Sequence, residues 1–321
     1  MPFTAAPVDA RRLPTPALRR FAWGVLAYFI AVILWGTVVR ATGSGAGCGD
    51  HWPLCNGTVI QHSPRAATMI EFTHRLSSGI AFLAVVGLLV WTFARTVHGH
   101  LARVTVAAAV VFTLIEAAIG ALLVKLGLTA ESHSPLRAPY LALHLTNTLL
   151  LVAALALTAH FLGRSAGYLR GGIRVAAPFS TIVCCLALLA VGVTGSLAAL
   201  GDTLFPAHSL AMALNQDFAS KSAWLVRWRW VHPTFAVLAS VFFLWVLARA
   251  AQRSAYWNNR PLALLVLILL AVQYSLGVLN VLLLAPVWLQ VTHLLGADLL
   301  WTAFVVLAAR ITLEPAPPVS S

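Results

Sequence analysis

Four histidines in this chain have the residue type and the spacing to hold a metal cofactor. Each lies about 4–6 residues after the start of an apolar stretch, and all four stretches begin on the same predicted side of a membrane. At 1.5 Å per residue, their side chains share one depth, roughly 6–9 Å below the outer interface. An ionisable side chain inside a membrane span is costly and usually functional. The four residues are His74, His144, His232 and His293.

The shared depth favours haem over other cofactors. A proton relay would step through the membrane, and zinc or copper would more often bring Cys, Asp or Glu ligands to the same level. Axial ligation of a haem iron by histidines on facing helices fits best. The sequence therefore predicts two haem sites, one in each half of the chain.

An acidic residue makes the two halves unequal. Glu71 lies three residues before His74, on the same helix face, whereas the corresponding residue before His232 is Arg229. A buried carboxylate beside an iron site could relay protons or steady a charged intermediate. The alternative is an ion pair of Glu71 with Arg75 or Arg40 at the membrane edge.

Two further acidic residues, Glu116 and Asp298, fall about one turn deeper than the histidines. Neither has a histidine on its own helix face, so we interpret both as hydrogen-bonded packing residues. The asymmetry around Glu71 suggests that the N-terminal half does chemistry and that the C-terminal half holds a fixed cofactor.

The segment 40–57 is the least membrane-like part of the chain. Its alternating glycines permit close backbone approach and positive φ angles, but no Lys-Ser/Thr follows, so a phosphate-binding loop is rejected. Cys48 and Cys55 lie on the outer, oxidising side and predict a disulfide, either as a loop staple or as a redox pair. Cys184 and Cys185 are interpreted as buried apolar residues.

Eight apolar stretches position these residues, and each is about long enough to cross a bilayer. The predicted fold is an all-α membrane protein of eight transmembrane helices, arranged as two similar four-helix bundles. The predicted spans are 21–39, 69–93, 104–124, 139–162, 177–200, 226–249, 262–285 and 289–309.

Composition and charge agree with this fold. Of 321 residues, 60% are hydrophobic and 9% are charged, and the net charge is +12, which excludes a soluble globular enzyme. Most Arg and Lys residues fall in the terminal segments and the even-numbered connections. Both termini are therefore predicted to be cytoplasmic, in a bacterial cell membrane rather than a mitochondrial one. The positive excess is a topology signal, and nucleic-acid binding is not expected.

An internal duplication is indicated by three pairs of similar segments. The string Thr-Gly-Ser recurs at 42–44 and 194–196, and the histidines of spans two and four recur in spans six and eight. Repeats of this kind are common in membrane proteins. The predicted domains are a tail (1–20), an N-terminal half (21–165), a C-terminal half (166–310) and a second tail (311–321).

These residues together resemble the haem A synthase family. The motifs are Thr42-Gly-Ser-Gly-Ala-Gly-Cys48, Trp52-Pro-Leu-Cys55-Asn-Gly and Glu71-Phe-Thr-His74-Arg75, followed by the histidines of spans four, six and eight. The resemblance covers about residues 20–310. It implies oxidation of the C8 methyl group of haem O to a formyl group by two successive hydroxylations.

The resemblance also implies roles for single residues. His74 and His144 would hold the substrate haem, with Glu71 as the essential acid, and His232 and His293 would ligate a haem b that passes electrons. Cys48 and Cys55 would form the first-loop disulfide. A haem O synthase is the expected partner, the product would supply cytochrome oxidase, and a homo-oligomer is left open.

The chain departs from the family pattern in two places. Pro233 stands where an Arg is expected after the histidine of span six, so Arg227 or Arg229 would have to serve instead. With Arg40 and Arg75, these are the candidate partners for haem propionates or acidic side chains. The third outer loop, 201–225, lacks the second cysteine pair of some members. The competing functions are a di-haem electron carrier, such as a quinol-oxidising cytochrome b, and a non-catalytic haem carrier.

Overall fold

The computed structural model describes residues 14–58, 65–130, 132–164, 173–175, 179–252 and 259–315. Much of the two predicted tails lies outside these ranges. Eight described helices are long and apolar enough to cross a membrane, which confirms the predicted fold and makes the chain a multi-pass membrane protein. They are α1 (Pro16–Ala41), α2 (Ala66–Arg95), α3 (Leu101–Lys125), α4 (Arg137–Phe161), α5 (Phe179–Leu204), α7 (Trp224–Ala250), α9 (Arg260–Leu282) and α10 (Val287–Thr312).

Local sequence signals account for helix ends. Thr15 caps α1, because its side chain accepts a hydrogen bond from the Leu18 amide, and Pro16 occupies the first turn, where no intrahelical N–H bond is lost. At the other end of a span, α3 is followed by Gly127, which has a φ of 63°. This left-handed conformation suits glycine and closes the helix.

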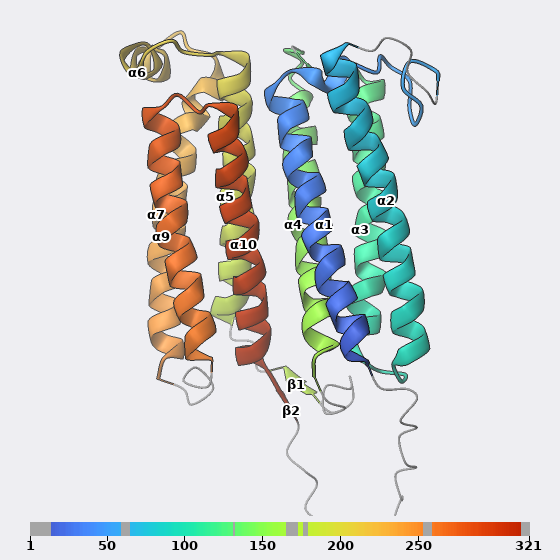
Figure 1. The fold of residues 1–321 in the computed structure, drawn as a ribbon. Helices are drawn as coiled ribbons and strands as arrows, with labels where there is room; N and C mark the ends of the chain where they lie inside the picture. The colour runs from blue at the N-terminus through green and yellow to red at the C-terminus, as the bar shows by residue number, and fades with distance from the viewer. Residues whose placement is uncertain are drawn as a thin grey trace, which may run out of the picture.

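The helices form two neighbouring groups (Figure 1). We call α1–α4 the N-terminal half, and α5, α7, α9 and α10 the C-terminal half. The helices α10 and α4 pack across the boundary, where the Trp301 indole donates to the Leu149 carbonyl at 2.7 Å. Arg40 joins the halves nearer one end, donating to the Ala199 carbonyl in α5 and to Gln290 in α10.

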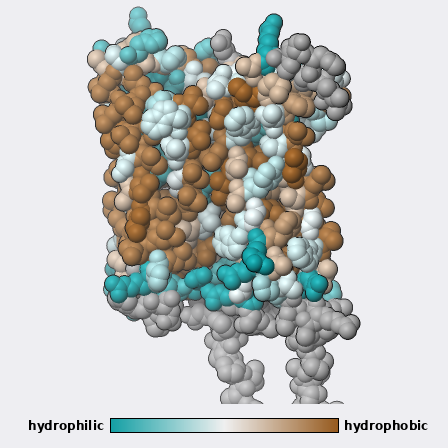
Figure 2. Space-filling view, viewed as in Figure 1, coloured by the Kyte–Doolittle hydropathy of each residue, from teal (hydrophilic) through white to brown (hydrophobic). Residues whose placement is uncertain are grey.

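The connections at the two ends of the bundle differ. At one end lie the loop after α1, with the short 3-10 helix η2 (Ser44–Ala46), and the helix α6 (Leu210–Phe218), which the sequence did not predict. At the other end, β1 (Ile173–Val175) and β2 (Leu313–Pro315) pair antiparallel, a small addition to the predicted all-α fold. Figure 2 shows a hydrophobic band over the helices and hydrophilic residues towards both ends, as expected for a membrane-spanning body.

Candidate functional site

The loop after α1 is pressed against the first turn of α2. A Cβ atom at Gly47 would lie 2.5 Å from the Ala67 backbone, so only glycine allows this approach. The Gly47 carbonyl accepts a hydrogen bond from the Thr68 hydroxyl at 2.8 Å. The glycine-rich segment is thereby confirmed as a close-approach loop, and it brings the next residue, Cys48, to the face of α2 that carries Glu71.

Glu71 is the centre of the polar cluster at this end. Its carboxylate is buried, with 3% exposure, and accepts a hydrogen bond from the Cys48 amide at 2.8 Å. It also pairs with Arg75 at 2.5 Å, so the ion pair given above as the alternative interpretation of Glu71 is present, with Arg75 and not with Arg40. Because Arg75 also donates to the His51 and Leu54 carbonyls, this one ion pair holds both sides of the loop.

The predicted disulfide is present. Cys48 and Cys55 are bonded, and the Asn56 amide donates to the Cys48 carbonyl at 3.0 Å, closing the loop. The disulfide therefore lies one hydrogen bond away from Glu71. This contact is compatible with either a structural or a redox role.

Each half places a glycine of its first helix against the histidine of its second helix. A Cβ at Gly36 would lie 3.0 Å from the His74 ring, and a Cβ at Gly195 would lie 3.0 Å from the His232 ring. The structural counterpart of Gly195 is therefore Gly36. The sequence pairing of Gly195 with Gly43 is wrong, because Gly43 lies beyond α1 and starts η2 with a φ of 67°.

The histidine pair of the N-terminal half comes from α2 and α4. The Nδ1 atom of His74 has no hydrogen-bond partner among the described residues. His144 Nδ1 lies 3.3 Å from the Glu116 carboxylate, although this contact is not aligned as a hydrogen bond.

The predicted role of Glu116 as a hydrogen-bonded residue is correct, but its approach to His144 was not predicted. Glu116 accepts hydrogen bonds from the Asn147 amide and the Thr148 hydroxyl, so its interpretation as a hydrogen-bonded residue is confirmed. The approach to His144 was missed because the two residues lie on different helices, α3 and α4. Only the similar predicted depth of Glu116 and His144 in the membrane could have indicated from the sequence that these two residues approach each other.

The histidine pair of the C-terminal half comes from α7 and α10. The ring centroids of His232 and His293 are 6.4 Å apart, and the ring planes are at 90°. His232 Nδ1 lies 3.2 Å from the Thr194 hydroxyl, and the Gln273 amide nitrogen lies 3.3 Å from His293 Nε2. This half therefore surrounds its histidines with neutral partners.

Arg229 lies where α5, α6 and α7 meet, at the same end of the bundle as α6. It pairs with Asp202 at 2.8 Å and Asp217 at 3.3 Å, and donates to the Gly201 and Phe205 carbonyls. Burial raises the pKa of Asp217 in α6, and the nearby Arg229 charge opposes that rise. This network ties α5, α6 and α7 together.

The remaining predicted residues take ordinary structural positions. Arg227 donates to the Ser220 carbonyl at 2.9 Å in the loop before α7, and Pro233 lies inside α7. Cys184 is buried and Cys185 half-buried, and neither forms a disulfide. The structure thus brings neither Cys184 nor Arg227 to the histidine pairs.

Asp298 requires a correction. It is fully buried in α10, but neither carboxylate oxygen has a hydrogen-bond partner among the described residues. The prediction that it is a hydrogen-bonded packing residue is therefore wrong. Sequence depth could not reveal this, because hydrogen bonding of a span residue depends on which side chains the neighbouring helices present.

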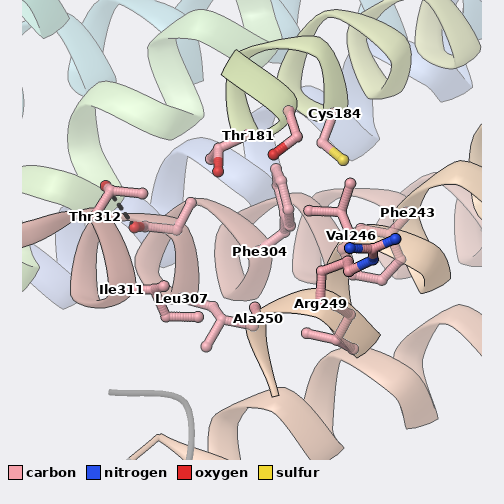
Figure 3. Close-up of a pocket in the computed structure, with 13 residues that line it drawn as sticks. Thr181, Cys184, Phe243, Val246, Arg249, Ala250, Phe304, Leu307, Ile311 and Thr312 are labelled. Atoms are coloured by element: carbon pink, nitrogen blue, oxygen red, sulfur yellow. Dashed lines mark hydrogen bonds between the residues drawn. The ribbon is translucent and has the colours of Figure 1, made fainter. Parts of the chain in front are cut away.

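A pocket lies between the beginning of α5 and the ends of α7 and α10, away from the histidines (Figure 3). Cys184, Phe243 and Phe304 line it, with Arg249 at its side. His232 and His293 lie near the opposite ends of α7 and α10. The pocket therefore belongs to the other end of the bundle.

Comparisons with known proteins agree with the resemblance of the motifs. The sequence profile of the family described as cytochrome oxidase assembly protein matches residues 19–305. A protein of Thermus thermophilus named protoheme IX farnesyltransferase is 43% identical over 299 residues, which is 92% of this chain and 49% of the relative. The chain thus spans about half the length of that relative.

Relatives named heme A synthase match over shorter segments or at lower identity. The protein of Bacillus licheniformis is 26% identical over 236 residues, 71% of this chain and 73% of the relative. The protein of an Exiguobacterium species is 42% identical over 96 residues, 30% of this chain and 32% of the relative.

Proposed function

The chain belongs to the family of cytochrome oxidase assembly proteins, and from this premise we propose that it is a haem A synthase. The observation that carries the proposal is the unequal setting of two similar histidine pairs. In the N-terminal half, Glu71 lies three residues before His74 on α2 and contacts the Cys48–Cys55 loop, whereas the C-terminal pair has neutral partners. A reactive site and a fixed cofactor site need this difference.

In this proposal the N-terminal half binds the substrate, haem O, through His74 and His144. His74 Nδ1 has no hydrogen-bond partner among the described residues. Neutral histidine nitrogens are common iron ligands. The two histidines come from α2, which also carries Glu71, and from α4, whose His144 lies 3.3 Å from Glu116 of α3.

The C-terminal half fits a resident haem b. A metal–imidazole bond is about 2 Å long, so the 6.4 Å between the His232 and His293 ring centroids is about the separation expected if both rings bound one metal ion. Gln273 would have to turn away from His293 Nε2 for that nitrogen to bind. A haem b bound there would supply one-electron transfer.

The reaction on haem O replaces one C–H bond of the methyl group by C–OH in each of two hydroxylations. With O2 as the oxidant, each hydroxylation also consumes two electrons and two protons and releases one water, and the electrons would arrive through the haem b of the C-terminal half. The resulting geminal diol loses water to leave the formyl group. One hydroxyl must receive a proton and the other must lose one, and we assign this proton transfer to Glu71, a buried carboxylate three residues before His74. Its contacts with the Cys48 amide and Arg75 hold that carboxylate in one position.

The names of the relatives support a series of reactions in which haem O is made first and is then oxidised. Several are named heme A synthase, and one with a chain about twice as long is named protoheme IX farnesyltransferase. We therefore propose haem O as the substrate and a haem O synthase as the partner. Both termini are proposed to be cytoplasmic, in a bacterial cell membrane.

Prenyl transfer by this chain itself is less well supported. That chemistry needs a Mg²⁺–diphosphate site, which carboxylates close to one another usually build. The acidic residues of this chain stand singly in the sequence, and the two described carboxylates that share a partner, Asp202 and Asp217, both pair with Arg229.

The test is co-expression of the full chain with a haem O synthase, followed by mass analysis of the extracted haems. Wild type should yield haem A, and Glu71→Gln should lower its yield by about 10²-fold or more and accumulate haem O or a hydroxylated intermediate. The control, Asp217→Asn, changes an acidic residue of the other half and should still yield haem A. Haem O alone from folded wild type that carries haem b would refute the proposal. Two equivalent haem b groups that never exchange would indicate an electron carrier.

A further inference from the structure

The third helix of each half directs a polar side chain at the histidine of the fourth helix. In the N-terminal half, a Glu116 oxygen lies 3.3 Å from His144 Nδ1. In the C-terminal half, the Gln273 amide nitrogen lies 3.3 Å from His293 Nε2. The distances are equal, but one partner is a carboxylate and the other is a neutral amide.

Glu116 is held in place by more than its approach to the histidine. The Asn147 amide donates to one of its oxygens and the Thr148 hydroxyl to the other. Asn147 is itself oriented, because the same amide nitrogen donates to the Phe112 carbonyl at 2.9 Å. A carboxylate has about four acceptor sites, so two donors leave it able to accept a third hydrogen bond from His144.

The Glu116 carboxylate determines which nitrogen of the neutral His144 ring carries the proton. A neutral imidazole carries a proton on only one nitrogen, and a carboxylate can only accept. A small rotation of the His144 ring would align Nδ1–H with Glu116 and leave the Nε2 lone pair free for a metal. Histidines that ligate metals usually donate their second ring nitrogen in this way, which orients the ring and makes it a stronger ligand.

The other histidine of the N-terminal pair lacks such support. His74 Nδ1 has no hydrogen-bond partner among the described residues, and no carboxylate is within ion-pair distance of it there. Glu71, on the same helix, is committed to the Cys48 amide and Arg75. The two rings of this site therefore differ in the strength with which they can hold iron.

We propose that Glu116 is a positioning residue that holds His144 with its proton on Nδ1, making His144 the persistent ligand of the substrate haem and His74 the exchangeable one. This inference rests on the proposed function, in which these two histidines bind haem O. Exchange at His74 would free the iron face on the side of Glu71 while the substrate stays attached through His144.

The test uses the purified full-length protein loaded with haem O, and compares Glu116→Gln with Thr148→Val. The first variant gives the N-terminal site the neutral amide found at Gln273. The second removes one hydrogen bond from Glu116 but keeps its charge. The readouts are the rate of haem O transfer to apomyoglobin and the reduction potential of the N-terminal haem.

Glu116→Gln should release haem O about 10- to 100-fold faster than wild type and shift the reduction potential of that haem to a more positive value. Thr148→Val should change both much less, and the spectrum of the C-terminal haem b should be unchanged. Equal effects of the two variants, or an unchanged potential in Glu116→Gln, would show a structural role only and overturn the inference.

The reciprocal variant keeps the inference testable if Glu116→Gln does not fold. Gln273→Glu puts a carboxylate at His293 Nε2, the nitrogen proposed to bind iron, so it should draw the ring proton to Nε2 and release haem b faster than wild type. Unchanged release of haem b would count against the inference. Wild type that binds no haem O at all would instead refute the proposed function, which separates the two failures.

Discussion

Glu71 and Arg229 occupy corresponding positions in the two halves, each three residues before a histidine. Their charges are opposite, but each side chain forms hydrogen bonds that join two parts of its half. Glu71 accepts from the Cys48 amide in the loop that follows α1. Arg229 donates to the Gly201 and Phe205 carbonyls, where α5 ends. Each side chain therefore ties the second helix of its half to the end of the first.

The chemical consequences of this exchange are different. A buried carboxylate can carry a proton, whereas a guanidinium stays charged and can only donate. The same contrast recurs deeper in the bundle, with Glu116 beside His144 and Gln273 beside His293. The comparison teaches that one helical arrangement serves both halves, and that a few charge differences give the two histidine pairs different surroundings.

The most severe test of this comparison removes one histidine from each half. His232→Ala should abolish binding of haem b, because its pair is left with one ligand. His74→Ala should leave that haem b in place and lose haem A formation. Visible spectra and haem extraction of both purified variants measure this. Loss of the same haem from both variants would show that the two sites are not separate.

Arg229→Gln should be the most destabilising charge change in the C-terminal half. It leaves Asp217, whose side chain is 8% exposed, without its cation, and also Asp202, which is 36% exposed. Loss of one partner of a buried pair costs about 3 kcal/mol or more, reduced here by the exposure of Asp202. Thermal unfolding in detergent should show a lower Tm, with haem A still formed at permissive temperature. Wild-type stability would mean that the network does not hold α6 in place.

Asp298→Asn should have the smallest effect of the three. The corresponding position in the N-terminal half, five residues after the fourth-helix histidine, is the apolar Leu149. Because neither Asp298 oxygen has a described partner, the substitution breaks no known hydrogen bond and should change the free energy of unfolding by about 1 kcal/mol or less. Thermal unfolding and haem A yield are the measurements. A large loss of haem A would show that the C-terminal half also has a functional carboxylate.

Periodicity and composition were sufficient for much of the fold. The eight spans could be predicted from the length and hydrophobicity of local segments. The Glu71–Arg75 ion pair follows from i,i+4 spacing, and the Cys48–Cys55 disulfide follows from two nearby cysteines on the predicted outer side. The helix α6 was missed because it is short and lies within a polar connection. Its Ser209 cap, which accepts from the Met212 amide, was the available signal.

The errors have a common cause. The Thr-Gly-Ser string paired Gly195 with Gly43, but contact with a histidine ring identifies Gly36 as the counterpart. Asp298 was assigned hydrogen bonds that the described structure lacks. In both cases the decisive neighbour lies on another helix, and matching strings or equal depths contain no information about which helix that is.

By itself, the sequence determined that this protein lies in a membrane and how many spans it has and how long they are. It also indicated that the four histidines lie at similar positions in their spans. These follow from the cost of placing polar groups in hydrocarbon and from the fixed rise of an α-helix. Tertiary structure alone decided which side chains meet across helices, such as Glu116 with His144, and Gln273 with His293. Such meetings depend on the rotation and packing of whole helices, so only the folded bundle shows which histidine has a carboxylate behind it.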